Sequence, residues 1–303
     1  MSESTIGTRN REVLVGSKST WKTIISLSLF SIAQIVVAEA ELQNKQISAQ
    51  GTSQNALHMA ALGDSITRAF NANGPIDHPW NSWATGNSDE NGLFQRGQVK
   101  SHAEFLSETT GRDVIVHNVA KSGATSSDLA RQVQSLKGVK LDYATILIGA
   151  NDLCAHGQPT TPDGHADMTE YAGRVESGIT QLIAENPQIK ILLVSIPDLL
   201  RLQRIGHGTS CQSRWNTFGI CKMLLGANVT EDSIAQFGAQ LRTANEDLHL
   251  IAAKHSASVQ FSTILSEYPY ERDQLSDVDC FHPNIAGQNI ISRETWNTGW
   301  WKD

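Results

Sequence analysis

The residues of this chain that are capable of nucleophilic chemistry lie in widely separated segments. Gly63-Asp64-Ser65 supplies a hydroxyl group, and Asp279-Cys280-Phe281-His282 supplies a carboxylate and an imidazole three positions apart. A serine hydroxyl becomes a nucleophile when a base takes its proton, and a histidine acts as that base when a carboxylate fixes its tautomer. Ser65, His282 and Asp279 therefore form a candidate triad for attack on an ester carbonyl.

Five short apolar runs, separated by segments with helical periodicity, must position these residues. The runs cover 57–62, 113–119, 143–149, 190–196 and 258–264, and the helical segments cover 101–111, 125–136, 169–186 and 230–256. Near-continuous apolar strands that alternate with helices are typical of a parallel sheet covered on both faces. The sequence therefore predicts one α/β domain over residues 57–303.

The chemically capable residues follow the predicted strands. In a parallel sheet of this kind, ligands bind outside the carboxyl ends of the strands. Gly63 to Ser65 follow the first run, Gly123 follows the second and Asn151 follows the third, while Asp279 and His282 come after the fifth. A Gly-Asp-Ser triplet alone arises by chance in roughly one chain in ten of this length, and Ser65 alone would also suit a helix N-cap. The ordered combination is therefore more specific than any single residue.

In this order the segments resemble the four sequence blocks of the SGNH, or GDSL-type, hydrolase superfamily. The blocks match Ser65, Gly123, Asn151 and His282, and the resemblance covers about residues 57–293. The first block reads Gly-Asp-Ser-Ile where the family name has Gly-Asp-Ser-Leu, a change between two aliphatic residues. The stretches GDSIT, NSW (81–83), GANDLC (149–154) and DCFHP (279–283) look closest to the phospholipase B-like branch of lipases and esterases.

The resemblance implies a flavodoxin-like, three-layer α/β/α sandwich with strand order 2-1-3-4-5 and a serine ester hydrolase that needs no cofactor and no metal. It also implies an oxyanion hole, which stabilises the negative charge that develops on the carbonyl oxygen. The donors are the backbone N–H groups of Ser65 and Gly123 and the side-chain amide of Asn151. Asp64 and Asp152 are expected to make structural hydrogen bonds.

The first forty residues have the pattern of an export signal. Basic residues precede a mainly apolar run that ends in Ala38-Glu39-Ala40, the small-x-small pattern of signal peptidase cleavage. We expect residues 1–40 to be a signal peptide, residues 41–56 to be a flexible lead-in, and the protein to be periplasmic or secreted. An uncleaved anchor is the alternative, but serines and Gln34 interrupt the run, whereas a spanning helix needs about 20 predominantly apolar residues.

The amino-acid composition indicates which classes of molecule the protein is expected to bind. The chain has 40% hydrophobic and 18% charged residues, which is ordinary for a soluble globular protein. Its formal net charge is −7 and no block of lysines or arginines is present, so nucleic acid is not an expected partner. The expected partner is a small-molecule or lipid ester substrate, with no stable membrane span once the signal is removed.

The four cysteines are expected to form disulfides if the protein is exported. Cys211 and Cys221 lie ten positions apart in one segment that looks like a loop, so we expect Cys211–Cys221, with Cys154–Cys280 as the second bond. Four cysteines allow three connectivities. A zinc site is the alternative, but the chain has no C-x-x-C and its spacings fit no common zinc pattern.

The long connection at residues 199–229 provides a prediction about the kind of substrate. Connections are usually two to six residues long, and much longer ones tend to be functional. We expect this segment to border the pocket and its apolar residues to form an acyl-chain channel with two upstream tryptophans, namely Trp80, Trp83, Trp215, Phe218, Ile220, Met223, Leu224 and Leu225. A disulfide-stapled segment that packs on its own small core is an equal alternative.

Three functional classes are open at this point. The phospholipase B-like resemblance favours lipid or acyl esters, and the alternatives are a carbohydrate O-acetylesterase and an exported binding module that has lost catalysis. The α/β-hydrolase fold displays its nucleophile as G-x-S-x-G, whereas here Thr67 occupies the last position. That fold is therefore not supported.

Overall fold

A five-stranded parallel sheet forms the centre of the computed structural model, which describes residues 55–86, 97–157, 160–162 and 164–301. The strands are β1 (Leu57–Gly63), β2 (Val114–Asn118), β3 (Tyr143–Leu147), β4 (Lys190–Val194) and β5 (Val259–Ser262). Their order is β2-β1-β3-β4-β5 and every neighbouring pair is parallel. The predicted fold class, strand positions and strand order are confirmed. The predicted signal peptide and all but the last two residues of the lead-in lie outside the described residues.

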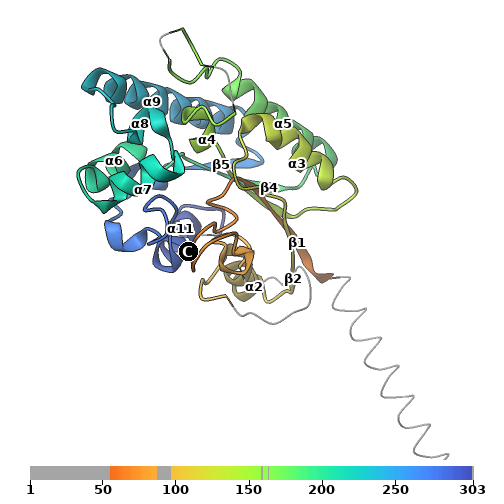
Figure 1. The fold of residues 1–303 in the computed structure, drawn as a ribbon. Helices are drawn as coiled ribbons and strands as arrows, with labels where there is room; N and C mark the ends of the chain where they lie inside the picture. The colour runs from red at the N-terminus through yellow and green to blue at the C-terminus, as the bar shows by residue number, and fades with distance from the viewer. Residues whose placement is uncertain (1–54, 87–96, 158–159, 163, 302–303) are drawn as a thin grey trace, which may run out of the picture. The chain divides into compact units, whose positions relative to one another are not determined.

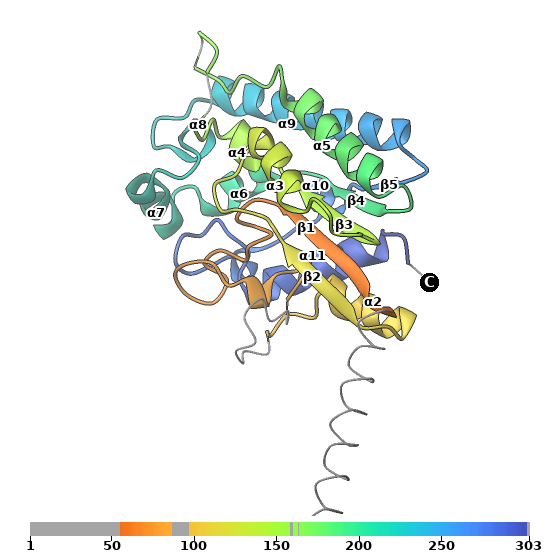
Figure 2. The ribbon, with the colours of Figure 1, turned by 90° about the vertical axis from the view of Figure 1, so that its right-hand side faces the viewer.

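Helices cover both faces of the sheet, so the domain has three layers (Figures 1 and 2). One face carries α3 (Leu129–Ser135), α5 (Tyr171–Glu185) and α9 (Glu231–Lys254), and the other carries α2 (His102–Thr110) and α11 (Ile285–Asn297). Since side chains alternate across a strand, Ala60 and Leu62 of β1 join the core on the first face, while Met59 and Ala61 join the core on the second. Both faces of the strand are therefore buried.

The remaining elements are short. Outside residues 199–229, which are described below, they are the α-helices α4 (Ala150–Leu153) and α10 (Ile264–Glu267) and the 3-10 helices η1 (Pro79–Asn81), η2 (Ser126–Asp128) and η3 (Arg272–Gln274). None of the helices formed by the described residues is long and apolar enough to cross a membrane.

Gly63 lets β1 end in close contact with β3. It pairs with Leu147, and its φ of +143° is a conformation that residues with a Cβ rarely adopt. A Cβ at this position would lie 2.2 Å from the carbonyl oxygen of Leu147. The close packing of β1 against β3 therefore requires glycine at position 63, which is the first residue of the Gly-Asp-Ser triplet and lies two residues before Ser65.

Residues 199–229 are not the loop that the sequence predicts. They form α6 (Leu199–Gly206), α7 (Ser210–Phe218) and α8 (Lys222–Leu225), capped by the side chains of Asp198 and Thr209 and by a left-handed Gly219. The prediction was wrong because each helix is too short to display a clear helical period in the sequence.

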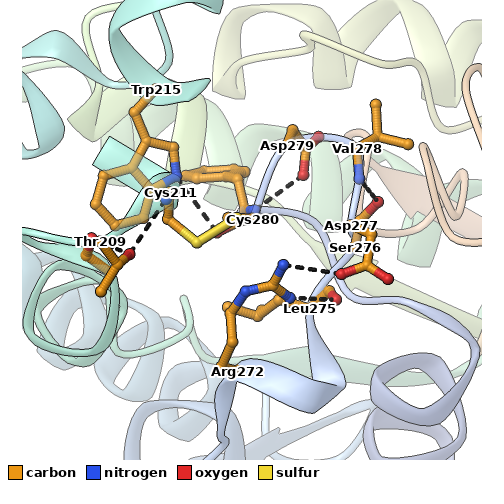
Figure 3. The surroundings of a disulfide bond; sticks show 12 residues. Thr209, Cys211, Trp215, Arg272, Leu275, Ser276, Asp277, Val278, Asp279 and Cys280 are labelled. Atoms are coloured by element: carbon orange, nitrogen blue, oxygen red, sulfur yellow. Dashed lines mark hydrogen bonds and ion pairs between the residues drawn. A yellow bond between two sulfur atoms is a disulfide. The ribbon is translucent and has the colours of Figure 1, made fainter. Parts of the chain in front are cut away.

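The two disulfides are Cys154–Cys221 and Cys211–Cys280, so the predicted pairs Cys211–Cys221 and Cys154–Cys280 are wrong. Proximity along the chain misled that prediction, because Cys211 lies in the first turn of α7 whereas Cys221 precedes α8. Cys211 faces the segment that follows η3, where Cys280 lies (Figure 3). The bonds join residues 67 and 69 positions apart.

We expect each disulfide to stabilise the fold by constraining the unfolded chain. Loops of this length correspond to about 4 kcal/mol per bond in the chain-entropy estimate. The paired substitutions Cys154→Ser with Cys221→Ser, and Cys211→Ser with Cys280→Ser, should each lower the melting temperature in a thermal unfolding measurement. Peptide mapping without reductant should recover the two observed pairs, and a peptide that links Cys211 to Cys221 would contradict this assignment.

Candidate active site

Ser65 lies just beyond β1, where the chain turns away from the sheet. Residues 65–72 form consecutive turns in which the N–H of Phe70 donates to the carbonyl of Ser65 and the N–H of Arg68 donates to that of Asp64. The Oγ of Ser65 lies 2.8 Å from Nε2 of His282, a residue 217 positions further on. Ser65 is 7% exposed, so the hydroxyl is held in the protein rather than free in solvent.

His282 and Asp279 lie in one closed loop before α11. Leu275 pairs with Pro283 in an isolated bridge, and the N–H of Ser276 donates to the carbonyl of His282. Nδ1 of His282 lies 2.6 Å from Oδ2 of Asp279. The structure thus brings the three predicted triad residues together in one hydrogen-bonded row.

The charge of Asp279 determines the direction of these hydrogen bonds. Burial by itself raises the pKa of Asp279, but the hydrogen bond and charge of His282 and the hydrogen bond from Asn71 outweigh it and hold the pKa below its usual range. An ionised carboxylate only accepts hydrogen bonds, so Nδ1 of His282 carries the proton. When the imidazole is neutral, Nε2 carries no proton and can accept the hydroxyl proton of Ser65, which is the arrangement that general base catalysis requires.

Hydrogen bonds link the segment of Gly123 to the end of β1 and the side chain of Asn151 to that segment. The N–H of Lys121 donates to the carbonyl of Gly63, and Nδ2 of Asn151 donates to the carbonyl of Ala124 at 2.9 Å. An amide nitrogen carries two protons, so Asn151 retains one for a ligand. Gly123 has a φ of +82°, and a Cβ there would lie 3.2 Å from Nε2 of His156. The three predicted oxyanion donors thus come from segments held against one another.

Asp64 and Asp152 make the hydrogen bonds expected of structural residues. Oδ1 of Asp64 accepts from the N–H of Ile66 at 2.9 Å. Asp152 in α4 accepts from both the N–H and the Oγ of Ser126, which ties α4 to η2. Burial raises the pKa of both carboxyl groups, that of Asp64 to about 7.

Two contacts that the sequence did not indicate support the triad loop. Nδ2 of Asn71 donates to Oδ2 of Asp279 at 2.6 Å, and Nε1 of Trp215 donates to the carbonyl of Cys280 at 3.3 Å. Figure 3 shows the indole of Trp215 beside the Cys211–Cys280 disulfide. Asn71 lies in a local Asn-Ala-Asn-Gly stretch that signals a turn but not a partner 208 positions away.

An apolar cavity lies beside the triad, although Ser65, Asp279 and His282 do not themselves line it. Ile66, the neighbour of Ser65, and Phe281 and Pro283, the two neighbours of His282, contribute to its wall. The rest of the wall comes from α6, α10, α11 and the segments between them, including Leu199, Leu202, Leu265, Tyr268, Ile290 and Ile291. The long connection therefore does border the cavity, through α6.

The predicted channel residues do not form this cavity. Trp83 and Trp215 are buried in the two cores, Leu224 and Leu225 are buried with Trp215, and Phe218 is 60% exposed. A Cβ on Gly206 would lie 2.0 Å from the indole of Trp215, so that ring fills the space beside α6. The buried residues of 199–229 belong to the core on the α3, α5 and α9 face of the sheet, and their cysteines are bonded to Cys154 and Cys280 outside the segment, so the alternative of a small core of its own is wrong as well. In the described part of the chain, no group of three His, Cys, Asp or Glu residues is placed to hold a metal ion.

The buried carboxyl of Asp64 should make stability depend on pH. Its pKa of about 7 lies above the ordinary 3.8, so the folded state binds the proton more tightly than the unfolded state, and stability falls as the pH rises between these values. Asp64→Asn keeps an acceptor for Ile66 and has no charge to bury. We expect the variant to match the wild type near pH 4 and to gain up to about 4 kcal/mol relative to it near pH 8.

Thermal or denaturant unfolding of both proteins across this pH range measures the difference. An equal difference in stability at every pH would contradict the raised pKa of Asp64.

Known proteins share the sequence family and the fold of this chain. The GDSL-like Lipase/Acylhydrolase family matches residues 61–290. The structure is similar to phospholipase A1 from Streptomyces albidoflavus NA297, with 16% identity, coverage of 80% of this chain and 100% of that chain, and a TM-score of 0.51. It is also similar to a protein from Parabacteroides merdae ATCC 43184 described as a GDSL-like lipase, with 17% identity, coverage of 80% and 95%, and a TM-score of 0.52.

At sequence identities of 16% and 17% the two structures show only that the fold is shared, and the assignment of the chain to a family rests on the family match. No curated protein matches the chain. The family match spans the sheet from β1 onward, the Gly-Asp-Ser triplet and the loop that holds Asp279 and His282. The chain therefore belongs to the GDSL-like lipase/acylhydrolase family and is a carboxylic ester hydrolase.

Proposed function

We propose that this protein is an exported serine hydrolase that cleaves lipid or other acyl esters, with Ser65 as nucleophile, His282 as base and Asp279 as the carboxylate that orients the base. The observation that carries the proposal is the hydrogen-bonded row of these residues, 2.8 Å from Ser65 to His282 and 2.6 Å from His282 to Asp279, beside an apolar cavity. An exported binding module without catalysis would have no use for a buried, aligned row of this kind.

The reaction begins with proton transfer from the Ser65 hydroxyl to Nε2 of His282 as Oγ attacks the ester carbonyl. Asp279 stabilises the imidazolium that forms. The N–H groups of Ser65 and Gly123 and the free proton of the Asn151 amide donate to the developing oxyanion. His282 then gives its proton to the leaving alcohol, and the acyl group stays on Ser65. A water molecule, deprotonated by His282, releases the acid and restores the hydroxyl.

The preference for acyl chains rests on the cavity beside the triad. Its wall is almost wholly apolar, and its contributions from Ile66, Phe281 and Pro283 place it within one residue of the nucleophile and the base along the chain. Transfer of an alkyl chain from water into such an apolar site is favourable, and the free energy of transfer is about 0.8 kcal/mol for each CH₂ group that is buried. Similarity to phospholipase A1 from Streptomyces albidoflavus NA297 agrees with this preference.

Export to a periplasmic or extracellular location is part of the proposal. All four cysteines are paired, and disulfides persist mainly in oxidising compartments. The basic and apolar pattern of residues 1–40 supports the same location. The likeness to the phospholipase B-like branch remains a prediction from sequence.

Replacement of the nucleophile should abolish the activity without unfolding the protein. Ser65→Ala removes the attacking oxygen, so we expect hydrolysis of an aryl ester to fall by at least about 10³-fold and covalent labelling by a phosphonate to disappear. Ser213→Ala, which changes an exposed serine in α7, is the matched control and should keep both. Ester hydrolysis by Ser65→Ala at the wild-type rate would refute the mechanism.

A bulky side chain in the cavity should change the preference for chain length. Ile290→Trp places an indole in the wall, so we expect kcat/KM for esters of eight carbons or more to fall at least about tenfold while acetate esters are hydrolysed as before. Leu250→Trp, on the exposed face of α9, is the control.

A series of nitrophenyl esters from two to twelve carbons provides the measurement. If the wild type deacetylates xylan fragments efficiently and ignores long acyl esters and phospholipids, the acyl preference is wrong and a carbohydrate O-acetylesterase replaces it.

A further inference from the structure

Asn71 belongs to the turns that follow Ser65, yet its side chain reaches the carboxylate at the other end of the candidate triad. The residue is buried, and its φ of +57° is a left-handed conformation that asparagine tolerates better than most residues. Its N–H donates to the carbonyl of Ile76, and its own carbonyl accepts from Oγ of Ser276 at 2.7 Å. The backbone of Asn71 thus joins the nucleophile segment to the loop of Asp279 and His282.

The orientation of the Asn71 amide is determined by its partners. The N–H of Ile76 donates to Oδ1 of Asn71 at 3.1 Å, so Oδ1 must face Ile76. Nδ2 then faces Oδ2 of Asp279, 2.6 Å away, and donates to it. A flipped amide would set two N–H groups against each other at Ile76 and two oxygens against each other at Asp279. Donation to Asp279 is therefore the consistent arrangement.

Asn71 completes the hydrogen bonding of the buried carboxylate. Oδ1 of Asp279 accepts from the N–H groups of Phe281 and His282, at 2.9 and 3.0 Å. Oδ2 accepts from Nδ1 of His282 and from Nδ2 of Asn71, both at 2.6 Å. Asp279 is 2% exposed, so bulk water has little access to replace a lost donor. Without Asn71, the oxygen that orients the imidazole would depend on the imidazole alone.

We propose that Asn71 is a positioning residue for the hydrolysis, acting through Asp279. Its amide holds Oδ2 in line with Nδ1 of His282 and keeps the carboxylate ionised, so that the imidazolium formed after proton transfer from Ser65 meets a fixed negative charge. The inference rests on the proposed function, because Asn71 can position the carboxylate for catalysis only if Ser65, His282 and Asp279 carry out the hydrolysis.

Asn71→Gly tests the role of the amide. Glycine adopts the left-handed backbone freely, so the variant removes the amide, together with its bond from the N–H of Ile76, and retains the backbone hydrogen bonds of residue 71. We expect kcat per phosphonate-titratable site to fall about 10- to 100-fold, which corresponds to the loss of one hydrogen bond to a charged group, while KM stays near the wild-type value. The downfield proton resonance of the His282–Asp279 hydrogen bond should also shift or broaden.

Two further variants separate positioning from a purely structural role. Ile76→Gly changes the same turn at an exposed residue with a φ of +78° and leaves the Asn71 amide in place, so it should keep the wild-type kcat and resonance. Asn71→Asp keeps the shape and the acceptor for Ile76 but sets a carboxylate oxygen against Oδ2 of Asp279. Above the pH at which this pair of carboxyl groups loses its shared proton, the variant should therefore lose more activity than Asn71→Gly, whereas a purely structural role predicts that the isosteric variant loses less.

Wild-type kcat and resonance in Asn71→Gly, or higher activity in Asn71→Asp than in Asn71→Gly at a pH where both carboxyl groups of the pair are ionised, would overturn the positioning role and leave the proposed function intact. Activity in Ser65→Ala equal to that of the wild type would instead overturn the proposed function, and the role of Asn71 with it.

Discussion

The carboxylate of Asp279 is the group on which the candidate site depends, because the same two oxygens build the loop and orient the base. Its Oδ1 accepts from the backbone of Phe281 and His282 and thereby turns the chain around Cys280, whose φ of +54° is unusual for a residue with a Cβ. Its Oδ2 accepts from the imidazole of His282 and the amide of Asn71. Local backbone geometry and side-chain alignment are thus coupled through one buried charge.

The parallel sheet provides the frame in which this charge acts. Each chain segment that leaves the carboxyl end of β1, β2 or β3 delivers one part of the site, and the hydrogen bonds of Gly63 with Lys121 and of Asn151 with Ala124 hold these parts together. The two disulfides connect further helices to the site. Cys154 follows Asn151 by three positions and Cys280 follows Asp279 directly, so the helices α7 and α8 are covalently joined to both sides of the site.

Local patterns were sufficient to predict the sheet and the triad. β1 and β3 are nearly fully buried, so their sequences are continuous apolar runs, and the polar residues that follow them mark the strand ends. What local patterns could not predict were contacts between distant segments. Asn71 is separated from Asp279 by 208 positions, and the partners of the four cysteines depend on where α7 and α8 lie. The cavity beside the triad was also missed, because α6, α10 and α11 form it only when they are packed together.

The connectivity of the disulfides has a consequence for biosynthesis. In chain order the cysteines are Cys154, Cys211, Cys221 and Cys280, and neither bond joins consecutive ones. Oxidation of each cysteine with the next to emerge during synthesis or translocation would join Cys154 to Cys211 and Cys221 to Cys280. Conversion of those bonds to the native pairs requires thiolate attack and mixed-disulfide intermediates. If the cysteines oxidise in that order, production of the native protein calls for an isomerase or a redox buffer that permits exchange, and a purely oxidising environment traps the chain with its triad loop attached to the wrong helix.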